Sequence, residues 1–481
     1  MEFNFAQTPS GFLIGIIPAL ANRHGLIAGA TGTGKTVTVQ RLVEEFSRAG
    51  IPVFITDVKG DLSGVSMAGS MSAKMYDRLS MLKMGEPAWE ASPTIFWDLW
   101  GKTGHPIRTS ISKMGPLLLS RLMDLNETQH SVMQILFKIA DDQELNLIDM
   151  KDIHSLVTYV QNNLGDLKPQ YGHLSSASLG TIHRSLLALE ERGADLFFGE
   201  PALDVEDLLK VNDKGRGYLN ILMADKLMQN PVIYSTLLLW LLSEVYEELP
   251  EVGDLEKPKL VMVFDEAHLL FKDTPKALLE KIELVVRLIR SKGVGIYFAT
   301  QNPMDIPVSV LGQLSHRIQH ALKAFTPVDQ KVVRTVAQTL RSNKEFDTEE
   351  VMTQLGVGEA LVSVLDEKGS PTEVQRAWIL PPFSRIGVIT EEERKKIMEA
   401  SPYFGRYEKP VETVSAFEKL QNFMSKKKEQ KKPVKEGNAL NDFLFGTVGP
   451  RGGKKTGFIE KTATSLGKDL VRGLLGSFKK R

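Results

Sequence analysis

The sequence predicts an α/β protein with a mostly parallel β-sheet, and three observations carry this prediction. Short apolar stretches typical of strands alternate with longer stretches whose apolar residues recur at helical spacing. A glycine-rich turn joins the first of these strands, Gly25 to Gly29, to the first helix. A later apolar run, Leu260 to Phe264, ends in the two acids Asp265 and Glu266. Strands that alternate with helices in this way indicate βαβ units, whose strands are parallel.

The elements follow in a regular order along the chain. After the first strand we expect a helix over 35–49 and a strand over 51–61, and apolar residues at helical spacing fill the stretch from 103 to 215. Strand and helix patterns then alternate: strand 217–224, helix 234–248, strand 259–266, helix 276–291, strand 293–301 and strand 316–325. A hairpin over 358–379 is predicted to turn at Glu367, Lys368 and Gly369.

These patterns divide the chain into four segments. Residues 1–102 form the first part of the core and contain the glycine-rich turn. Residues 103–215 form a helical insertion or subdomain, and residues 216–390 form the second part of the core. Residues 391–481 combine a basic linker with an amphipathic C-terminal segment, in which Ile459, Leu466, Leu470, Leu474 and Phe478 lie on or near one stripe.

Composition excludes several classes of protein. With 42% hydrophobic and 25% charged residues, the chain reads as an ordinary globular protein. It has no cysteine, so disulfides, thiolate metal sites and cysteine nucleophiles are excluded. The N-terminus does not resemble a signal peptide, and no apolar stretch approaches the roughly 20 residues that span a bilayer. We therefore expect a cytoplasmic protein without an integral membrane segment.

Charge is unevenly distributed along the chain. Residues 421–481 contain 15 Lys or Arg and 5 Asp or Glu, a net charge of +10. The formal charge of the whole chain is zero, so the preceding residues carry −10. This asymmetry fits a polyanion or an acidic partner surface, and equally fits a solvated charged tail.

The glycine-rich turn "GATGTGKT" matches the phosphate-loop pattern from Gly29 to Thr36. Gly29, Gly32 and Gly34 let the backbone bend so that successive N–H groups, including those of Ala30, Thr31 and Thr33, face an anion. The following helix directs its positive end at the phosphates. Lys35 is predicted to reach the β and γ oxygens, and Thr36 to ligate Mg²⁺. The turn follows a strand and opens a helix, which is the context that the motif requires.

The two acids after Phe264 then divide into two roles. Asp265 is predicted to hold the metal with Thr36, through water. Glu266 is not needed for the metal, and we expect it to orient and polarise an attacking water. This second acid favours hydrolysis over phosphoryl transfer between substrates. Gln301, at the end of the next strand, could contact both the γ-phosphate and that water, or could be a cap or turn residue.

Other polar residues leave alternatives open. Arg290 ends a helix that also carries Glu283 and Arg287 on one face; it could be solvated, complement the helix C-terminus, or act as an arginine finger on a neighbouring subunit. Asp57 ends the strand after the first helix and could approach the γ-phosphate or hold a turn. His316 and His320 have the spacing of a helical metal pair, but in the predicted strand they lie too far apart for one ion.

Several of these motifs together resemble the HerA-like branch of the HerA/FtsK superfamily, and most closely its bacterial YjgR-type members. The resemblance rests on "HGLIAGATGTGKT", "DVKGDLSG", "FDEAH", "RSKGVGIYFATQNP" and the basic C-terminal segment. It implies a RecA-like core of the additional-strand, catalytic-Glu class, assembled as a homohexamer with ATP and Mg²⁺ between subunits. It also implies that Arg290 acts in trans and that Asp57 lies near the phosphates.

One departure from the family affects the expected partners. Archaeal members begin with a small β-barrel that docks a nuclease, whereas here the phosphate loop already starts at Gly29, so coupling to a nuclease is doubtful. We expect an ATP-driven DNA translocase or helicase-like motor. The alternative is an ATPase that acts on a protein partner, or a nucleotide-gated scaffold, which the acidic main body favours. The basic tail is expected to brace a neighbouring subunit; membrane or DNA contact is the alternative.

Overall fold

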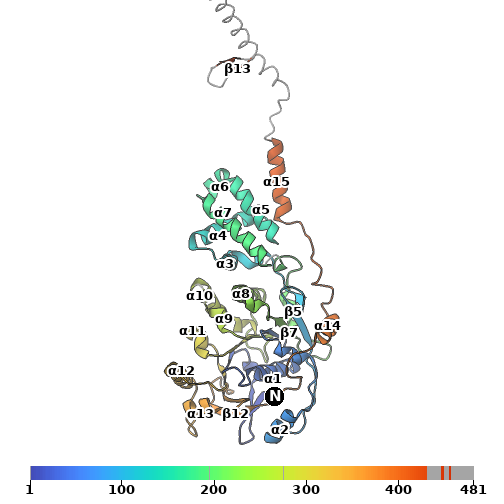
Figure 1. The fold of residues 1–481 in the computed structure, drawn as a ribbon, viewed down its shortest axis with the longest axis vertical. Coiled ribbons are helices and arrows are strands. Elements are labelled where there is room, and N and C mark those ends of the chain that lie inside the picture. Colours follow the sequence, from blue (N-terminus) through green and yellow to red (C-terminus); the bar gives the residue numbers. More distant parts are fainter. Residues whose placement is uncertain are drawn as a thin grey trace, which may run out of the picture. The chain divides into compact units, whose positions relative to one another are not determined.

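The structure is a computed structural model that describes residues 2–193, 196–272, 274 and 276–430, together with two short strands at 446–448 and 454–456. The chain forms two compact units, residues 1–417 and 418–481, and each is considered by itself. The first unit holds the main sheet and all the residues discussed below as a site (Figure 1). The predicted linker, residues 425–437, is described as far as Gln430, where it forms the end of a helix, and residues 431–437 and the amphipathic segment from Ile459 to Phe478 lie outside the described residues.

The main sheet has twelve strands in the order β2-β1-β12-β11-β10-β3-β9-β8-β4-β7-β5-β6. Their bounds in chain order are β1 (Phe3–Gln7), β2 (Leu13–Ile16), β3 (Gly25–Ala28), β4 (Val53–Asp57), β5 (Thr94–Asp98), β6 (His105–Pro106), β7 (Leu219–Met223), β8 (Leu260–Phe264), β9 (Val294–Thr300), β10 (His316–Gln319), β11 (Glu359–Ser363) and β12 (Gln375–Ile379). The two strands of the second unit, β13 (Gly446–Val448) and β14 (Lys454–Thr456), pair with each other.

Neighbouring strands from β10 through β6 are parallel, whereas β11, β12, β1 and β2 add an antiparallel edge. Strand β9 lies between β3, which leads into the glycine-rich turn, and β8, which leads into Asp265. This is the additional strand that the resemblance to the HerA/FtsK superfamily implies. The carboxyl ends of β3, β9 and β8 therefore meet at one edge of the sheet, which is where ligands bind in parallel sheets.

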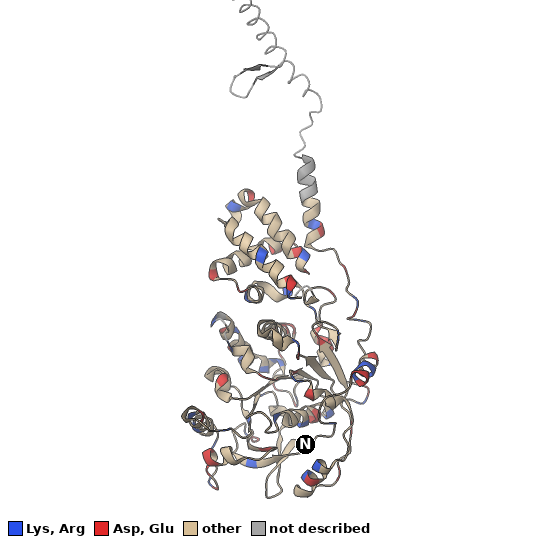
Figure 2. Ribbon diagram, in the orientation of Figure 1, with Lys and Arg blue, Asp and Glu red and all other residues tan. Residues whose placement is uncertain are grey.

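The central strands are apolar because both faces of the sheet are covered. All residues of β3, β4, β7, β8 and β9 are buried, and they read in the sequence as continuous apolar runs rather than alternating ones. In Figure 2 the central strands are almost entirely tan, while the surface helices α2 and α14 carry both positive and negative residues. The predicted mostly parallel α/β architecture is confirmed.

The α-helices have the bounds α1 (Lys35–Arg48), α2 (Ala73–Met81), α3 (Ile111–Leu122), α4 (Glu127–Asp142), α5 (Met150–Asn162), α6 (Leu164–Tyr171), α7 (Ser176–Glu191), α8 (Pro231–Glu248), α9 (His268–Phe271), α10 (Lys276–Leu288), α11 (Val308–Leu311), α12 (Pro327–Gln338), α13 (Thr348–Gln354), α14 (Glu391–Glu399) and α15 (Ala416–Gln430). Most of the longer helices begin at a residue whose side chain caps the first turn, such as Ser72 for α2 and Asn126 for α4.

Helices α3 to α7 gather into one group (teal to green in Figure 1) that packs on the core through α3 and α8. All five fall within residues 103–215, where the sequence shows helical spacing. The whole group belongs to the first compact unit, so its status as a separate subdomain stays a prediction.

Several predicted elements agree closely with the structure, and others differ at their ends. The strand expected over 316–325 ends at Gln319, and the strand expected over 51–61 is β4, which ends at Asp57. Strands β11 and β12 are antiparallel, and the N–H of Gly369 donates to the oxygen of Asp366 in the predicted turn. The helix expected over 276–291 ends instead at Leu288, and a 3₁₀ turn (Ile289–Lys292) follows it. Gly293 ends this turn with φ of 75°, a conformation that favours glycine.

No helix in the described part of the chain is long and apolar enough to span a membrane.

Candidate nucleotide-binding site

The glycine-rich turn connects β3 to α1 at the carboxyl edge of the sheet, as a phosphate loop requires. Gly34 precedes α1 with φ of 113° and provides no side-chain cap, so the first N–H groups of this helix lack a side-chain acceptor. A Cβ on Gly34 would lie 3.1 Å from the Cα of Gly358, which leaves little room for any other residue. The loop thus presents an uncapped helix N-terminus to solvent, which suits an anion.

Lys35 and Thr36 project their side chains from the first turn of α1. The Lys35 Nζ donates to the carbonyl oxygens of Gly29, at 2.7 Å, and Ala30, at 3.0 Å. Burial lowers the pKa of Lys35, and the nearby carboxylates of Glu266 and Asp265 oppose that shift. The Thr36 hydroxyl donates to Asp61 Oδ2 at 3.1 Å. The lysine folds over its own loop, and the threonine is paired with an acid of the neighbouring "DVKGDLSG" stretch.

Asp265 and Glu266 directly follow β8. The side chain of Tyr234, from α8, holds the end of that strand in place. The Tyr234 hydroxyl donates to the Asp265 carbonyl oxygen at 3.0 Å and lies 3.1 Å from Thr56 Oγ1, and the Asp265 N–H donates to Thr56 Oγ1 at 2.8 Å. Tyr234 therefore ties the carboxyl ends of β4 and β8 together. The sequence gives no sign of this role, because Tyr234 lies within an apolar helix.

Glu266 is held in a left-handed backbone conformation with φ of 48°, which is unfavourable for a residue with a side chain. Its carboxylate accepts a hydrogen bond from Gln301 Nε2 at 3.1 Å. The Lys59 Nζ and the His268 Nδ1 each lie 3.4 Å from a Glu266 oxygen. Strain at a buried acid among polar partners is typical of functional sites. Lys59 and His268 are neighbours that sequence reasoning missed.

Gln301 connects this carboxylate to the phosphate loop. While its Nε2 donates to Glu266, its Oε1 accepts a hydrogen bond from the Thr31 hydroxyl at 3.3 Å. The structure therefore places Gln301 between the loop and the predicted base. The alternative of a simple cap or turn residue does not account for these two contacts.

Four carboxylates gather at this edge of the sheet. Burial, together with the negative charge of Glu266, raises the pKa of Asp265 to about 6. Burial also raises the pKa of Asp57 to about 7, with added repulsion from Asp61 and Asp265. Among the described residues, Asp265 forms one side-chain hydrogen bond, to the N–H of Glu266, and no ion pair. Such excess negative charge suits a bound cation.

Asp57 takes the turn role that the sequence left open. It is fully buried, and its two oxygens accept the N–H groups of Gly60, at 2.7 Å, and Leu62, at 3.1 Å. Asp61, four residues on, is the acid that contacts Thr36. Asp61 belongs to the same motif, "DVKGDLSG". The position of Asp57 at the end of a predicted strand favoured Asp57 instead as the acid near the phosphates.

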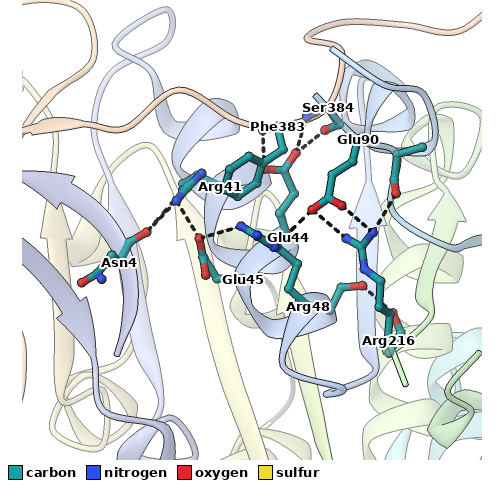
Figure 3. A network of polar contacts seen from close by, with 12 residues as sticks. Asn4, Arg41, Glu44, Glu45, Arg48, Glu90, Arg216, Phe383 and Ser384 are labelled. Atoms are coloured by element: carbon teal, nitrogen blue, oxygen red, sulfur yellow. Dashed lines mark hydrogen bonds and ion pairs between the residues drawn. The ribbon is translucent and has the colours of Figure 1, made fainter. Parts of the chain in front are cut away.

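The opposite side of α1 is anchored by a polar network (Figure 3). Arg41 donates to the carbonyl oxygens of Asn4 and Pro381 and to Glu45, and its guanidinium lies 4.0 Å from the ring centre of Phe383. Glu44 accepts the N–H groups of Phe383, at 2.9 Å, and Ser384, at 3.0 Å, and the Ser384 hydroxyl. The helix that carries the phosphate loop is thereby joined to β1 and to the segment after β12.

Arg287 and Arg290 are both exposed, and neither forms an ion pair or side-chain hydrogen bond within the described residues. Arg287 belongs to α10, whereas Arg290 lies in the 3₁₀ turn after it. Either guanidinium is therefore free to contact another molecule.

His316 and His320 serve structural contacts. His316 Nε2 donates to the Leu20 carbonyl oxygen at 2.9 Å. His320 Nδ1 donates to the Glu359 carbonyl oxygen, and its Nε2 accepts from the Thr38 hydroxyl, both at 2.8 Å. The strand predicted here is shorter than expected: β10 ends at Gln319, so His316 lies in the strand and His320 directly after it.

A cavity of about 890 Å³ lies beside the phosphate loop. Thr31, Gly32 and Thr33 line one side, and residues 321–325 together with parts of α12 and α13 line the other. This volume exceeds what a phosphate group alone needs, and it is typical of sites for small ligands.

The residues present fit a magnesium nucleotide. The hydroxyl of Thr36 and the carboxylates of Asp61 and Asp265 supply the oxygen ligands that Mg²⁺ prefers. The uncapped start of α1 and Lys35 supply donors and positive charge for phosphates. The surplus of buried negative charge around Asp265 would be offset by a divalent cation.

Fold and site together define a P-loop protein with a RecA-like core. Residues 3–481 match the family described as helicase HerA-like C-terminal, and the chain belongs to that family. Among curated relatives, the DNA double-strand break repair helicase HerA of Sulfurisphaera tokodaii is 23% identical over 71% of this chain and 62% of its own. A probable helicase of Methanocaldococcus jannaschii, MJECL08, is 30% identical over 25% of this chain and 22% of its own. The chain thus matches less than two thirds of either relative.

Solved structures share the fold. The plasmid coupling protein TrwB in complex with a non-hydrolysable GTP analogue has a TM-score of 0.53 at 14% identity, covering 78% of this chain and 89% of TrwB. VirB4 of Thermoanaerobacter pseudethanolicus has a TM-score of 0.51 at 14% identity, covering 78% of this chain and 96% of VirB4. TrwB has also been solved with ADP and Mg²⁺, at a TM-score of 0.50, 15% identity and coverages of 76% and 88%.

Proposed function

We propose that this protein hydrolyses ATP as a ring-forming cytoplasmic motor that acts on DNA. The observation that carries hydrolysis is the position of Glu266. Its carboxylate is buried at the end of β8, and Gln301 bridges it to Thr31 of the phosphate loop. A base in contact with a residue that touches the phosphate-binding loop can orient a water for attack on the terminal phosphate.

Each residue then has a distinct task. Lys35 leaves its loop carbonyls to bind phosphate oxygens, and the N–H groups of the first turn of α1 bind others. Thr36, Asp61 and Asp265 would hold Mg²⁺, which when bound neutralises phosphate charge. Glu266 accepts a proton from the attacking water at a carboxylate oxygen, and the Gln301 amide orients that water. The Lys59 Nζ, 3.4 Å from a Glu266 oxygen, offsets part of the negative charge at this carboxylate.

Arg290 is proposed to complete the site of a neighbouring subunit in a homohexamer. Its guanidinium is exposed and unpaired among the described residues, which suits a group that acts in trans. Arg287, on the preceding turn, is the alternative finger. An arginine supplied from outside the site stabilises charge that develops on the transferred phosphoryl group.

The proposal of DNA as the substrate is supported by the names of the relatives, two of which are called helicases. The test is ATP hydrolysis by the full-length protein with and without single- and double-stranded DNA. We expect DNA to raise the hydrolysis rate several-fold. Hydrolysis at the same rate with every nucleic acid would contradict the DNA motor, and would favour an ATPase that acts on a protein partner. Absence of hydrolysis under all conditions would contradict the proposed enzyme itself.

A further inference from the structure

A second cavity, of about 600 Å³, lies away from the phosphate loop, where α3 and α7 meet the start of α8 and the end of α9. Three cationic side chains line it: Arg121 from α3, Arg192 from the residue after α7, and Lys272 from the residue after α9. One acid, Asp124, also lines it. We name this space the Arg121 cavity.

Arg121 has one side-chain N–H₂ group without a hydrogen-bond partner. Its Nη2 donates to the hydroxyls of Ser235, at 2.9 Å, and Thr274, at 3.3 Å, but its Nη1 is buried without a hydrogen-bond partner. Burial lowers the pKa of Arg121. A partly buried guanidinium with neutral partners and an unused N–H₂ group is costly unless something else neutralises it.

Within the described residues, no acid pairs with these three cations. Asp124 lines the same cavity, yet it forms no ion pair with Arg121, Arg192 or Lys272 within the described residues. Arg192 and Lys272 are exposed and likewise form no ion pair there. A surface cluster of cations would normally be solvated separately, but here the three side chains line one cavity that also has apolar walls such as Leu125 and Leu269. A fixed site for an anion is the simplest account.

We propose that the Arg121 cavity binds a phosphate-type oxyanion. A guanidinium offers paired N–H donors whose geometry matches two oxygens of a phosphate, and lysine adds a mobile charge. The Ser235 hydroxyl accepts from Arg121 Nη2 and donates to the Val232 carbonyl oxygen, so it holds the guanidinium in position. The oxyanion is either a free phosphate or a phosphodiester of a nucleic-acid strand, since both present the same charged oxygens.

The short helix α9 connects the Arg121 cavity to Glu266. Leu269 and Lys272 belong to, or directly follow, α9, whose first residue His268 lies 3.4 Å from the Glu266 carboxylate. The Leu269 N–H also donates to the Glu266 carbonyl oxygen at 3.0 Å. An anion bound in the cavity would therefore affect the position of Glu266 through α9. This coupling rests on the proposed hydrolysis, whereas the binding itself does not.

The test measures binding to the full-length protein in the background of Lys35→Ala, so that the phosphate loop contributes little. Inorganic phosphate is titrated against sodium chloride at equal ionic strength, and the melting temperature is followed. We expect saturable stabilisation by phosphate that persists in Lys35→Ala. If the stabilisation is present in the wild type but lost in Lys35→Ala, phosphate binds at the loop and the proposal is overturned, while the proposed ATPase is untouched.

Variants of the cavity complete the test. Arg192→Gln and Lys272→Gln change exposed side chains and should fold normally, and each should weaken phosphate binding by about tenfold because a charge-assisted hydrogen bond is lost. Arg121→Met should abolish it. The matched control is Arg184→Gln, an exposed residue on α7 that bonds only Thr181 of its own helix. An equal effect of the control, or no effect of the cavity variants, would overturn the proposal.

A second arm identifies the source of the oxyanion. A fluorescently labelled oligothymidylate is titrated in the same Lys35→Ala background and in the same variants. Weakened binding of both phosphate and the oligonucleotide supports the proposal with a nucleic-acid strand as the source. Weakened binding of phosphate alone supports it with a free phosphate as the source. Unchanged binding of both in Arg192→Gln and Lys272→Gln overturns it.

Discussion

The Gln301 amide nitrogen lies 3.1 Å from the Glu266 carboxylate, and the same side chain accepts a hydrogen bond from Thr31 of the phosphate loop. Gln301→Glu would place two carboxylates in contact, and like charges raise the pKa of the base. We expect the acid limb of the pH–rate profile for ATP hydrolysis to move upward by about one pH unit or more. Gln301→Ala, the control, should lower the rate without that shift. An unchanged profile in Gln301→Glu would contradict contact between these residues during turnover.

Glu266→Gln should separate nucleotide binding from hydrolysis. The amide keeps the shape of the side chain but cannot accept a proton, so the turnover rate should fall by about 10²- to 10⁴-fold. Affinity for ATP, measured with a fluorescent analogue, should change only a few-fold. Glu280→Gln, on the exposed side of α10, provides a matched control. A large loss of affinity in Glu266→Gln would assign the residue to binding.

Arg290 can be tested by mixing subunits. Arg290→Ala should lower hydrolysis by about 10³-fold or more if it acts as a finger, and Lys35→Ala should also be inactive. In a mixed ring, a Lys35→Ala subunit can offer its Arg290 to the intact phosphate loop of an Arg290→Ala neighbour. We therefore expect the mixture to recover activity that neither variant has alone. Recovery with Arg287→Ala in place of Arg290→Ala would assign the finger to Arg287, and no recovery in either mixture would argue against action in trans.

Arg41 should be a major contributor to the stability of the first unit. Arg41→Met keeps much of the packing on Phe383 but leaves Glu45 and two carbonyl oxygens without their donor. Removing one partner of such a buried network costs about 3–5 kcal/mol in the free energy of unfolding. Urea unfolding followed by tryptophan fluorescence measures this loss. The exposed Arg184→Met should change stability by less than about 0.5 kcal/mol, and a similar value for Arg41→Met would refute the role of the network.

Asp57 should make the nucleotide-free protein less stable as the pH rises. Its pKa is raised from 3.8 to about 7 by burial and by neighbouring acids, so the folded state disfavours the ionised form. The contribution of protonated Asp57 to the stability of the folded state is fully present below about pH 4. It is lost as the pH rises through 7. Melting temperatures between pH 4 and pH 8 should fall accordingly, and Asp57→Asn should flatten the slope. If the melting temperature of Asp57→Asn falls with pH as steeply as that of the wild type, groups other than Asp57 determine the pH dependence of stability.

Much of the site could be predicted because local chemistry dictates it. The loop from Gly29 to Thr36 needs its residues in one order, and the strand before Asp265 is a continuous apolar run because both faces of the sheet are covered. Contacts between distant residues could not be predicted in the same way. The pairing of Thr36 with Asp61 and the bridge from Tyr234 to Thr56 depend on how α1, α8 and the strand ends pack. Strand β5 was also missed, because five buried residues of mixed type show no clear periodicity.

The network around Arg41 and Glu44 has a mechanical consequence. Because α1 is joined to β1 and to the segment after β12, the helix behind the phosphate loop cannot tilt without moving both. A change of ligand at the loop would then displace this whole edge of the sheet as one stiff body, instead of being absorbed by a local rearrangement. In the proposed motor, such a rigid connection would transmit a change at the phosphate loop to the antiparallel edge of the sheet.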